Sequence, residues 1–259
     1  MAMTDSWSDD FALNLFNVKD KVVVITGGNG TLGAAYARTF ALHGAHVIVT
    51  ARNSSTLDEV VASTQDTEGS CVAYSSDVTD RTSISRLVGE IDRKYGHIDV
   101  LINNAGMGIT GPIEEIPDAE IRKVFDTNYF GVINVIKAVL PFMRKQGDGF
   151  IINITSIAGY MGLPYRGIYS ATKGALELTT EAFRMELKEF NIKMTNIAPG
   201  DFATNIAAGR YHAPVLEDSP YKEPYGNTLK LMNEDVDAGK DPFVMAKVVY
   251  KIIQEKDPR

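Results

Sequence analysis

Tyr169 and Lys173 lie four residues apart, and their types and spacing could do chemistry. In a helix, positions i and i+4 lie on one face, so the two side chains would be neighbours. A free phenol has a pKa of about 10 and is a weak base at neutral pH. A nearby ammonium group stabilises the phenolate and lowers that pKa. The pair could therefore exchange a proton with an alcohol or a ketone.

Two further polar residues could complete such a site. Ser156 ends the apolar run GFIINITS, 13 residues before Tyr169, and its hydroxyl could hold a substrate oxygen by hydrogen bonding. The alternative for Ser156 is a plain cap at the end of a strand. Asn128 falls within a long helical pattern, and asparagine is a poor helix former, so we expect a buried polar role for it. The alternative is an exposed position on a polar face.

The elements that must position these residues alternate between two patterns. Short apolar, β-branched runs begin at residues 21, 45, 71, 98, 149 and 192, and amphipathic helical patterns lie between them. Nearly continuous apolar runs are typical of strands buried on both faces, as in a parallel sheet. The chain is therefore predicted to be an α/β protein, a doubly wound parallel sheet of the Rossmann type with helices on both faces, in a single domain spanning residues 1–259.

Residues 201–241 break this alternation. The segment is irregular and rich in Pro, Tyr, Asn and Asp, and a long irregular stretch in a compact domain is usually functional or disordered. We expect it to form a lid over a substrate pocket, with Met161, Leu163 and Tyr165 as another wall. Tyr221 and Tyr225 suggest a medium-sized hydroxylated or ring ketone. A last helix is predicted over residues 241–256.

Composition excludes several classes of protein. The net charge of −7 argues against a nucleic-acid partner, and a single cysteine, Cys71, excludes an internal disulfide framework and a multi-cysteine zinc site. The four histidines lack metal-binding spacing, so no metal is expected. No apolar run approaches the roughly 18 residues of a membrane span, and the N-terminus has no signal-peptide pattern. We therefore expect a cytoplasmic protein without a membrane partner.

A glycine-rich stretch, TGGNGTLG, lies between the first strand and the first helix, from Thr26 to Gly33. Backbone N–H groups at a helix N-terminus carry partial positive charge that suits a pyrophosphate. The generic dinucleotide pattern GxGxxG fits Gly28, Gly30 and Gly33, and its position after the first strand strengthens a signal that is weak alone.

The stretch resembles the glycine motif of the short-chain dehydrogenases/reductases. Thr26, Gly27, Gly30 and Gly33 match the TGxxGxxG of the extended members, whereas the TGxxxGxG of the short members would need glycine at Thr31. Three other features favour the short type. The motif NNAG stands at residues 103–106, Ser156 lies at the short-type spacing before Tyr169, and 86 residues (259 − 173) remain after Lys173, too few for an added substrate domain. We expect a short-type enzyme with an atypical glycine loop.

The resemblance implies roles for individual residues. Asn128, Ser156, Tyr169 and Lys173 match the family's catalytic residues, with Asn128 holding a water connected to the lysine and Lys173 also binding the nicotinamide ribose. Asp77 and Val78 match the adenine site, and Phe202 and Thr204 match positions that anchor the carboxamide. The residues expected to contact the cofactor are Gly27, Asn29, Gly30, Thr31, Leu32, Gly33, Arg52, Asp77, Val78, Asn104, Ala105, Gly106, Tyr169, Lys173, Pro199, Gly200, Phe202 and Thr204.

The end of the second strand favours one nicotinamide cofactor over the other. An acidic residue there would accept a hydrogen bond from the 2′-hydroxyl of NAD. Ala51 takes that position and Arg52 follows, and arginine can bind a 2′-phosphate with paired donors. The sequence therefore favours NADP(H), while a solvated Arg52 would leave NAD(H) possible.

The predicted function is an NADPH-dependent oxidoreductase that transfers a hydride between the nicotinamide and a ketone or secondary alcohol, with Tyr169 as general acid/base. One alternative is a sugar or sugar-acid ketone reductase using NAD(H); Arg210, Lys222 and Lys230 are too scattered in sequence to decide whether the substrate is an acid. Another is a non-catalytic dinucleotide-sensing protein. We expect a homodimer or homotetramer, and favour a dimer through residues 119–145 and 169–190 because the chain lacks the family's seventh strand.

Overall fold

The structure is a computed structural model, and it describes residues 18–200, 202, 209–236, 240–255 and 258. A six-stranded parallel sheet runs through its centre in the order β3-β2-β1-β4-β6-β7. This is the strand order of a doubly wound dinucleotide-binding fold, so the predicted fold class is confirmed. The strands are β1 (Val22–Thr26), β2 (His46–Ala51), β3 (Ser70–Ser75), β4 (Val100–Asn103), β6 (Gly149–Ile154) and β7 (Ile192–Ile197).

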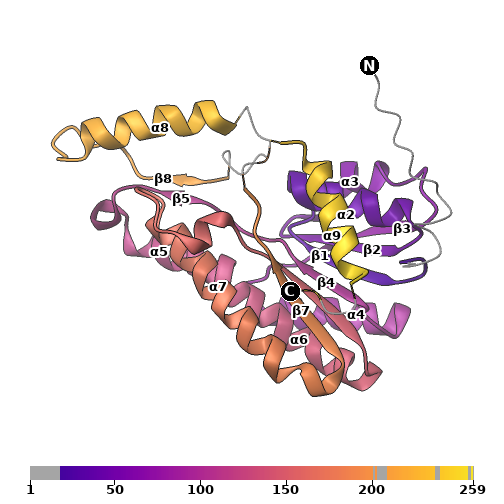
Figure 1. Ribbon diagram of the computed structural model, residues 1–259. Helices are drawn as coiled ribbons and strands as arrows, with labels where there is room; N and C mark the ends of the chain where they lie inside the picture. The colour runs from indigo at the N-terminus through magenta and orange to yellow at the C-terminus, as the bar shows by residue number, and fades with distance from the viewer. Residues whose placement is uncertain (1–17, 201, 203–208, 237–239, 256–257, 259) are drawn as a thin grey trace.

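Helices cover both faces of this sheet (Figure 1). On one face lie α2 (Thr31–Leu42) and α9 (Pro242–Ile253), and on the other lie α4 (Arg81–Tyr95), α6 (Gly131–Gln146) and α7 (Gly167–Glu186). Side chains of a strand point alternately to opposite faces. In β1, Val23 accordingly packs in the core with α2 and α9, and Val24 in the core with α4 and α6. Two buried faces explain why the strands read as continuous apolar runs.

The helix before β6 differs from the single long helix that the sequence predicts. It is divided into α5 (Asp118–Phe125), a π-helical turn η3 (Asp126–Phe130) and α6. The N–H of Gly131 donates to the carbonyl of Asp126, five residues back, and Asn128 lies within this turn. Such π-turns inside helices are frequent at functional sites, and this one widens the helix where Asn128 points inward.

A small second layer lies beside the main sheet and was not predicted. It pairs two short parallel strands, β5 (Ile109–Thr110) and β8 (Tyr211–His212), next to α8 (Lys222–Val236). Figure 1 shows α8, β8 and β5 together, away from α2 and α9. The interpretation of residues 201–241 as irregular is therefore wrong for α8, whose early Pro224 and Gly226 obscure its helical pattern. The shorter elements are η1 (Ser54–Leu57), α3 (Asp58–Ala62), η2 (Ile113–Glu115), η4 (Ile157–Tyr160) and η5 (Lys188–Phe190).

A buried hydrogen-bonded chain aligns the two strands that end beside the site. Asn103 and Asn153 are register partners in β4 and β6. The amide of Asn103 donates to Asn153 over 2.9 Å, and Asn153 donates in turn to the Thr180 hydroxyl on α7 over 2.8 Å. Hydrogen bonding offsets much of the cost of burying these amides, although the Oδ1 of Asn103 has no partner among the described residues. This chain therefore sets the positions of the strand ends and of α7 relative to each other.

Candidate active site

The glycine-rich turn after β1 is closely packed, and two of its glycines are required by geometry. Gly27 has φ +64°, and a Cβ there would lie 2.8 Å from the Cα of Ala105. A Cβ on Gly33, in the first turn of α2, would lie 2.5 Å from the carbonyl oxygen of Gly27. Any side chain at either position would push the turn away from its neighbours. Gly27 and Gly33 are two of the three glycines of the TGxxGxxG pattern; the third is Gly30.

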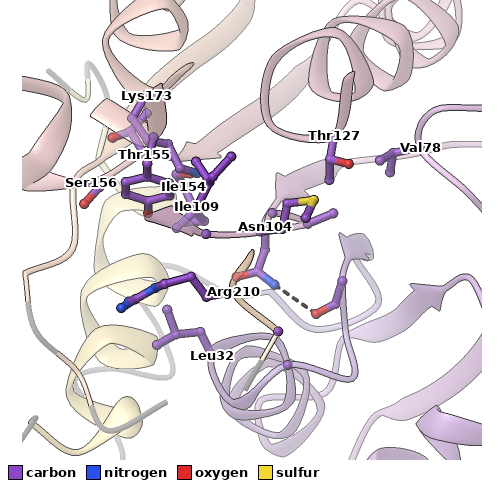
Figure 2. Close-up of a pocket in the computed structure, with 18 of the residues that line it drawn as sticks. Leu32, Val78, Asn104, Ile109, Thr127, Ile154, Thr155, Ser156, Lys173 and Arg210 are labelled. Atoms are coloured by element: carbon purple, nitrogen blue, oxygen red, sulfur yellow. Dashed lines mark hydrogen bonds between the residues drawn. The ribbon is translucent and has the colours of Figure 1, made fainter. Parts of the chain in front are cut away.

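Asn104 ties this turn to the end of β4. Its side-chain amide donates to the carbonyls of Thr26 and Gly27, over 3.1 and 3.0 Å. In return, the Thr26 hydroxyl accepts hydrogen bonds from the backbone N–H groups of Asn104 and Ala105. Figure 2 shows Asn104 with one of these bonds as a dashed line. The role of Thr26 was not recognised from the sequence, although it is part of the motif.

A cleft of about 1180 Å³ opens along the carboxyl ends of the strands. It is lined by most of the residues predicted to touch a cofactor or to catalyse. These are Gly27, Asn29, Gly30, Thr31, Leu32, Arg52, Asp77, Val78, Asn104, Ala105, Gly106, Ser156, Tyr169, Lys173, Pro199, Gly200 and Phe202. Two predicted residues, Gly33 and Asn128, lie behind the lining, and Thr204 lies outside the described residues.

The residues of the cleft fit a dinucleotide. Gly30 caps α2 without a side chain, and the first turn of that helix carries no acidic residue. The N–H groups of such a turn lack intrahelical acceptors and can bind a pyrophosphate. The volume exceeds that of a typical small-molecule pocket, which leaves room for a small substrate beside a cofactor.

Tyr169 and Ser156 meet in this cleft. Burial raises the pKa of Tyr169, and a hydrogen bond with Ser156 acts in the opposite direction, as do the charges of Arg210 and Arg166. Ser156 also caps η4, because its hydroxyl accepts from the N–H of Ala158 over 3.2 Å. The two readings of Ser156 weighed from the sequence, a strand-end cap and an active-site hydroxyl, are thus compatible in one side chain.

Lys173 lies one helical turn beyond Tyr169 and is 6% exposed. Its Nζ donates to the carbonyl of Ile154, at the end of β6, over 2.9 Å and stands 5.8 Å from the centre of the Tyr169 ring. Burial lowers the pKa of Lys173 to about 8, although the charge of Glu177 acts to raise it. The sequence predicted Lys173 as the cation that makes the phenol acidic; in this structure the cations that lower the Tyr169 pKa are Arg210 and Arg166.

Asn128 is fully buried and braces the site from behind. Its Oδ1 accepts from the N–H of Met107 over 2.8 Å, and its Nδ2 donates to the Met107 carbonyl over 2.9 Å. The same Nδ2 also reaches the Thr172 hydroxyl on α7, at 3.2 Å. The expected buried polar role is therefore confirmed, and Asn128 links the loop after β4 to the helix that carries Tyr169 and Lys173.

Other expectations for the walls of the pocket are corrected. Leu163 lines the cleft, but Met161 is 55% exposed and does not line it. Tyr165 packs instead against Tyr221 and Tyr225. These tyrosines belong to a small hydrophobic core, separate from the two cores of the main sheet, that forms around Ile109, Ile116, Val124, Ala213 and Tyr225. The Tyr225 hydroxyl donates to the backbone carbonyls of Thr110 and Ala213, so Tyr225 joins β5 to the segment after β8 and is not among the residues that line the cleft.

Two aspartates, Asp77 and Asp80, lie between β3 and α4 and have different roles. Its side chain accepts from the N–H and the hydroxyl of Thr79, while Asp80 caps α4 by accepting from the Thr82 N–H. The N-cap of α4 is therefore Asp80, and Asp77 closes the short turn before it. Asp77 lines the cleft, as does Val78 beside it.

Two charged residues near the site, Glu177 and Arg166, were not identified from the sequence, and Arg210 was named there without a place in the site. Glu177 is 8% exposed and accepts from the Asn196 amide over 2.5 Å. It stands four residues after Lys173, and that spacing could have revealed it. Arg166 and Arg210 both line the cleft although 44 residues separate them (210 − 166). Lys222, by contrast, pairs with Glu217, and Lys230 is exposed.

Among the described residues, none of the helices is both long and apolar enough to span a bilayer. The same part of the chain holds no cluster of three or more His, Cys, Asp or Glu residues arranged to bind a metal ion.

Comparison with known proteins places this cleft in a family. Residues 21–214 match the family model described as short chain dehydrogenase. The chain is 36% identical over 242 residues to a 3-ketodihydrosphingosine reductase of Bacteroides thetaiotaomicron, covering 93% of this chain and 86% of that protein. It is 37% identical to Dehydrogenase/reductase SDR family member 7B of Mus musculus, over 92% and 72% of the two chains.

Solved structures agree with this placement. A short-chain dehydrogenase from Streptomyces avermitilis superposes with a TM-score of 0.82 at 33% identity, over 92% of this chain and 86% of that one. An NAD⁺-bound xylitol dehydrogenase superposes with a TM-score of 0.76 at 26% identity, over 93% and 94%. The chain belongs to the short-chain dehydrogenase/reductase family. It is an oxidoreductase, and its relatives support a nicotinamide cofactor.

A pair of glycine substitutions tests the packing of the turn. We expect Gly33→Ala to lower the free energy of unfolding by about 1–3 kcal/mol, because the new methyl group would overlap the Gly27 carbonyl and the Gly28 backbone. Gly89→Ala in α4 is the control; nothing lies within 4 Å of its added methyl group, so it should stabilise by about 0.5–1 kcal/mol. Urea denaturation followed by circular dichroism measures both, and an equal response would contradict the packing argument.

The buried ammonium group of Lys173 gives stability a specific pH dependence. A pKa of about 8 in the fold against 10.5 for the free side chain means that the unfolded chain binds more protons between those values. Stability should therefore rise with pH through that window. Relative to Lys173→Met, the wild type should gain on the order of 3 kcal/mol between pH 8 and 10.5. Urea denaturation at several pH values measures this difference, and a constant difference would refute it.

Glu177 provides a second test of the pH range over which Lys173 makes stability rise. Its charge raises the Lys173 pKa, so Glu177→Gln should lower that pKa further and start the rise in stability at a lower pH. Glu181 lies on the same helix and is exposed, so Glu181→Gln is the matched control and should leave the window in place.

Proposed function

We propose that this protein is an NADPH-dependent reductase of ketones, which also runs in reverse on secondary alcohols. The observation that carries the proposal is the meeting of Tyr169 and Ser156 in the cleft, with the buried amine of Lys173 beside the Tyr169 ring. General acid catalysis needs a proton donor within hydrogen-bond reach of the substrate oxygen, and a hydroxyl that fixes that oxygen. Tyr169 and Ser156 supply these two functions.

The residues would act in a defined order. Ser156 donates a hydrogen bond to the carbonyl oxygen and holds it beside Tyr169. NADPH, when bound in the cleft, would supply the hydride that the carbonyl carbon accepts. Tyr169 delivers its proton to the oxygen as negative charge develops there, and the phenolate that remains is stabilised by Ser156 and by the surrounding cations. In the reverse direction, Tyr169 accepts the proton of the alcohol.

Cofactor contacts follow from the lining of the cleft. The turn at Gly27 and the start of α2 would hold the pyrophosphate, Asp77 and Val78 the adenine, and Lys173 the ribose of the nicotinamide. Pro199, Gly200 and Phe202 would flank the nicotinamide. By the family pattern, Asn128 would hold a water connected to Lys173. Residues 201–241 would form the lid of the substrate pocket, which Arg210 and Met232 of this segment support by lining the cleft.

The preference for NADPH rests on the end of β2. Ala51 is buried there, and Arg52 is exposed and lines the cleft. The next residue is Asn53, so no acid follows this strand directly to repel a 2′-phosphate. A guanidinium can bind a phosphate with two parallel hydrogen bonds. Use of NAD(H) is the alternative.

A second candidate is the reduction of 3-ketodihydrosphingosine. It is favoured by the 36% identity to the Bacteroides reductase of that name over most of both chains. Apolar side chains along the cleft, among them Met107, Ile109 and Leu163, would suit an aliphatic chain. Sugar or sugar-acid ketones remain a further candidate, and a cofactor sensor without catalysis is the alternative outside enzymes. An assay of hydride transfer, with each ketone and NADPH, decides among them.

We also infer that the protein forms a homodimer through the π-turn, α6 and α7, with a homotetramer as the alternative. Phe130, Leu178 and Met185 are 52%, 70% and 73% exposed on these elements. Large apolar side chains exposed along adjacent helices are typical of an interface between subunits. We place the enzyme in the cytoplasm.

Removal of the Tyr169 hydroxyl tests the mechanism. Tyr169→Phe should lower kcat at least about 100-fold, because proton delivery is lost, while the Kd for NADPH should change less than about threefold. NADPH fluorescence measures binding, and absorbance of the nicotinamide measures turnover. Tyr160→Phe is the control, because Tyr160 is 66% exposed and does not line the cleft. Substantial turnover by Tyr169→Phe would refute the role of the phenol.

Removal of the Arg52 guanidinium tests the choice of cofactor. Arg52→Ala should raise KM for NADPH about tenfold or more and change KM for NADH less than about twofold, because only NADPH carries the 2′-phosphate. Arg86→Ala is the matched control; Arg86 is exposed on α4 and does not line the cleft. Steady-state kinetics with both cofactors gives the comparison, and equal changes for the two would contradict the assignment.

A further inference from the structure

Arg210 is held in the cleft by backbone pairing. The N–H of Tyr211 donates to the carbonyl of Gly108 over 3.0 Å, and the parallel pairing of β5 with β8 continues from there. This pairing lays the Arg210 side chain against Gly108, where an added Cβ would lie 2.9 Å from its Cγ and 3.0 Å from its Nε. Figure 2 shows Arg210 in the cleft, with its guanidinium end extending away from Asn104.

Among the residues that the structure describes, none forms an ion pair with the guanidinium of Arg210. Its Nη1 is buried and has no hydrogen-bond partner among the described residues. Of the described residues that line the cleft, the acidic ones are Asp77 and Asp126; Asp77 accepts from Thr79, and neither forms an ion pair with Arg210. Arg210 as a whole is half-buried, and a partly desolvated cation without an anion is unfavourable, so an arriving anion would recover binding energy here.

Arg166 adds a second positive charge at the same place. It stands directly before α7, lines the cleft, and makes no ion pair among the described residues. The positive charges of Arg166 and Arg210 repel each other, and both act to lower the pKa of Tyr169. An anion within reach of both guanidinium groups would stabilise both and relieve the repulsion between them. Because both guanidinium groups act on the phenol, such an anion would lie close to the reacting carbonyl.

We propose that Arg210 and Arg166 form an anion-binding subsite beside Tyr169, and that the preferred substrates are ketones bearing a carboxylate or a phosphate within a few bonds of the carbonyl. The inference rests on the proposed ketone reduction and assigns its substrate class. It also revises the expectation from sequence that the basic residues are too scattered to decide for an acid, because the fold brings Arg210 into the same cleft as Arg166.

The anion could in principle come from the cofactor, since a pyrophosphate has the same chemistry. The turn between β1 and α2 is already built for a pyrophosphate, with Gly30 as the cap of α2. The two arginines instead act on Tyr169, where the substrate reacts. We therefore assign the subsite to the substrate, and the test separates the two sources.

The test compares ketones that differ only in the anion. Acetoacetate is paired with methyl acetoacetate, and dihydroxyacetone phosphate with dihydroxyacetone; 3-ketodihydrosphingosine is added as a ketone without an acidic group. With the wild type and NADPH, kcat/KM for the anionic member of at least one pair should exceed that of its neutral partner about 30-fold or more. In Arg210→Ala this ratio should fall toward one, and Arg210→Lys should restore part of it. Arg86→Ala should keep the wild-type ratio.

Binding provides a readout that does not depend on turnover. Acetoacetate or dihydroxyacetone phosphate should raise the melting temperature of the wild-type NADP⁺ complex, and this shift should vanish in Arg210→Ala and in Arg166→Ala. The Kd for NADPH should change less than about threefold in both variants. Arg210→Gln, which keeps the length and polarity of the side chain, replaces Arg210→Ala if circular dichroism shows the latter unfolded.

Each outcome bears on a separate statement. If neutral ketones or 3-ketodihydrosphingosine are reduced at least as well as every anionic ketone, the subsite is overturned while ketone reduction stands. If the variants weaken NADPH binding as much as they weaken turnover, the anion belongs to the cofactor and the assignment to the substrate is overturned. If anionic ketones bind through Arg210 but no ketone is reduced, the subsite stands and the proposed reductase activity fails.

Discussion

The hydrogen bonds between Asn104 and the turn at Gly27 are the interaction on which the rest of the cleft depends. They join the end of β4 to the end of β1, so the loop that lines one side of the cleft is fixed to the turn that forms its floor. Thr26 completes the link from the other direction by accepting two backbone N–H groups. Parallel strands end at one edge of the sheet, but only such bonds set the distance between their loops.

The ionisable groups of the site, Lys173 and Tyr169, lie largely out of contact with water. Lys173 is nearly buried, so its ammonium group is held by the carbonyl of Ile154 and by the charge of Glu177 instead of by solvent. Tyr169 is also largely enclosed, and burial disfavours its phenolate. The cations around it offset that cost. A site of this kind has a low effective dielectric, and a small displacement of any charge would change the proton affinity of the phenol.

The sequence was informative where residues that act together are close in the chain. Tyr169 and Lys173 share a helix, Ser156 ends the strand before it, and the two buried faces of β1 are visible as a continuous apolar run. It was uninformative where contacts join distant segments through weak local patterns. β5 and β8 are two residues each and have no period to detect, so nothing in the sequence indicated that Arg210 would lie beside Gly108 and share the cleft with Arg166. Tyr225 was read as a pocket residue because an aromatic side chain alone does not show which way it faces.

The atypical glycine loop illustrates which positions of a motif are constrained by geometry. Gly27 and Gly33 cannot carry a side chain without overlapping backbone atoms, whereas a Cβ at Gly30 would meet only the Gly27 carbonyl, at 3.4 Å. Position 31 is the first residue of α2, with no requirement for a left-handed backbone, so threonine is accommodated there. The loop can therefore depart from the usual short-type pattern at Thr31 while the turn keeps its shape. The bonds that hold the turn run from Asn104 to the carbonyls of Thr26 and Gly27, and neither bond involves the side chain of Thr31.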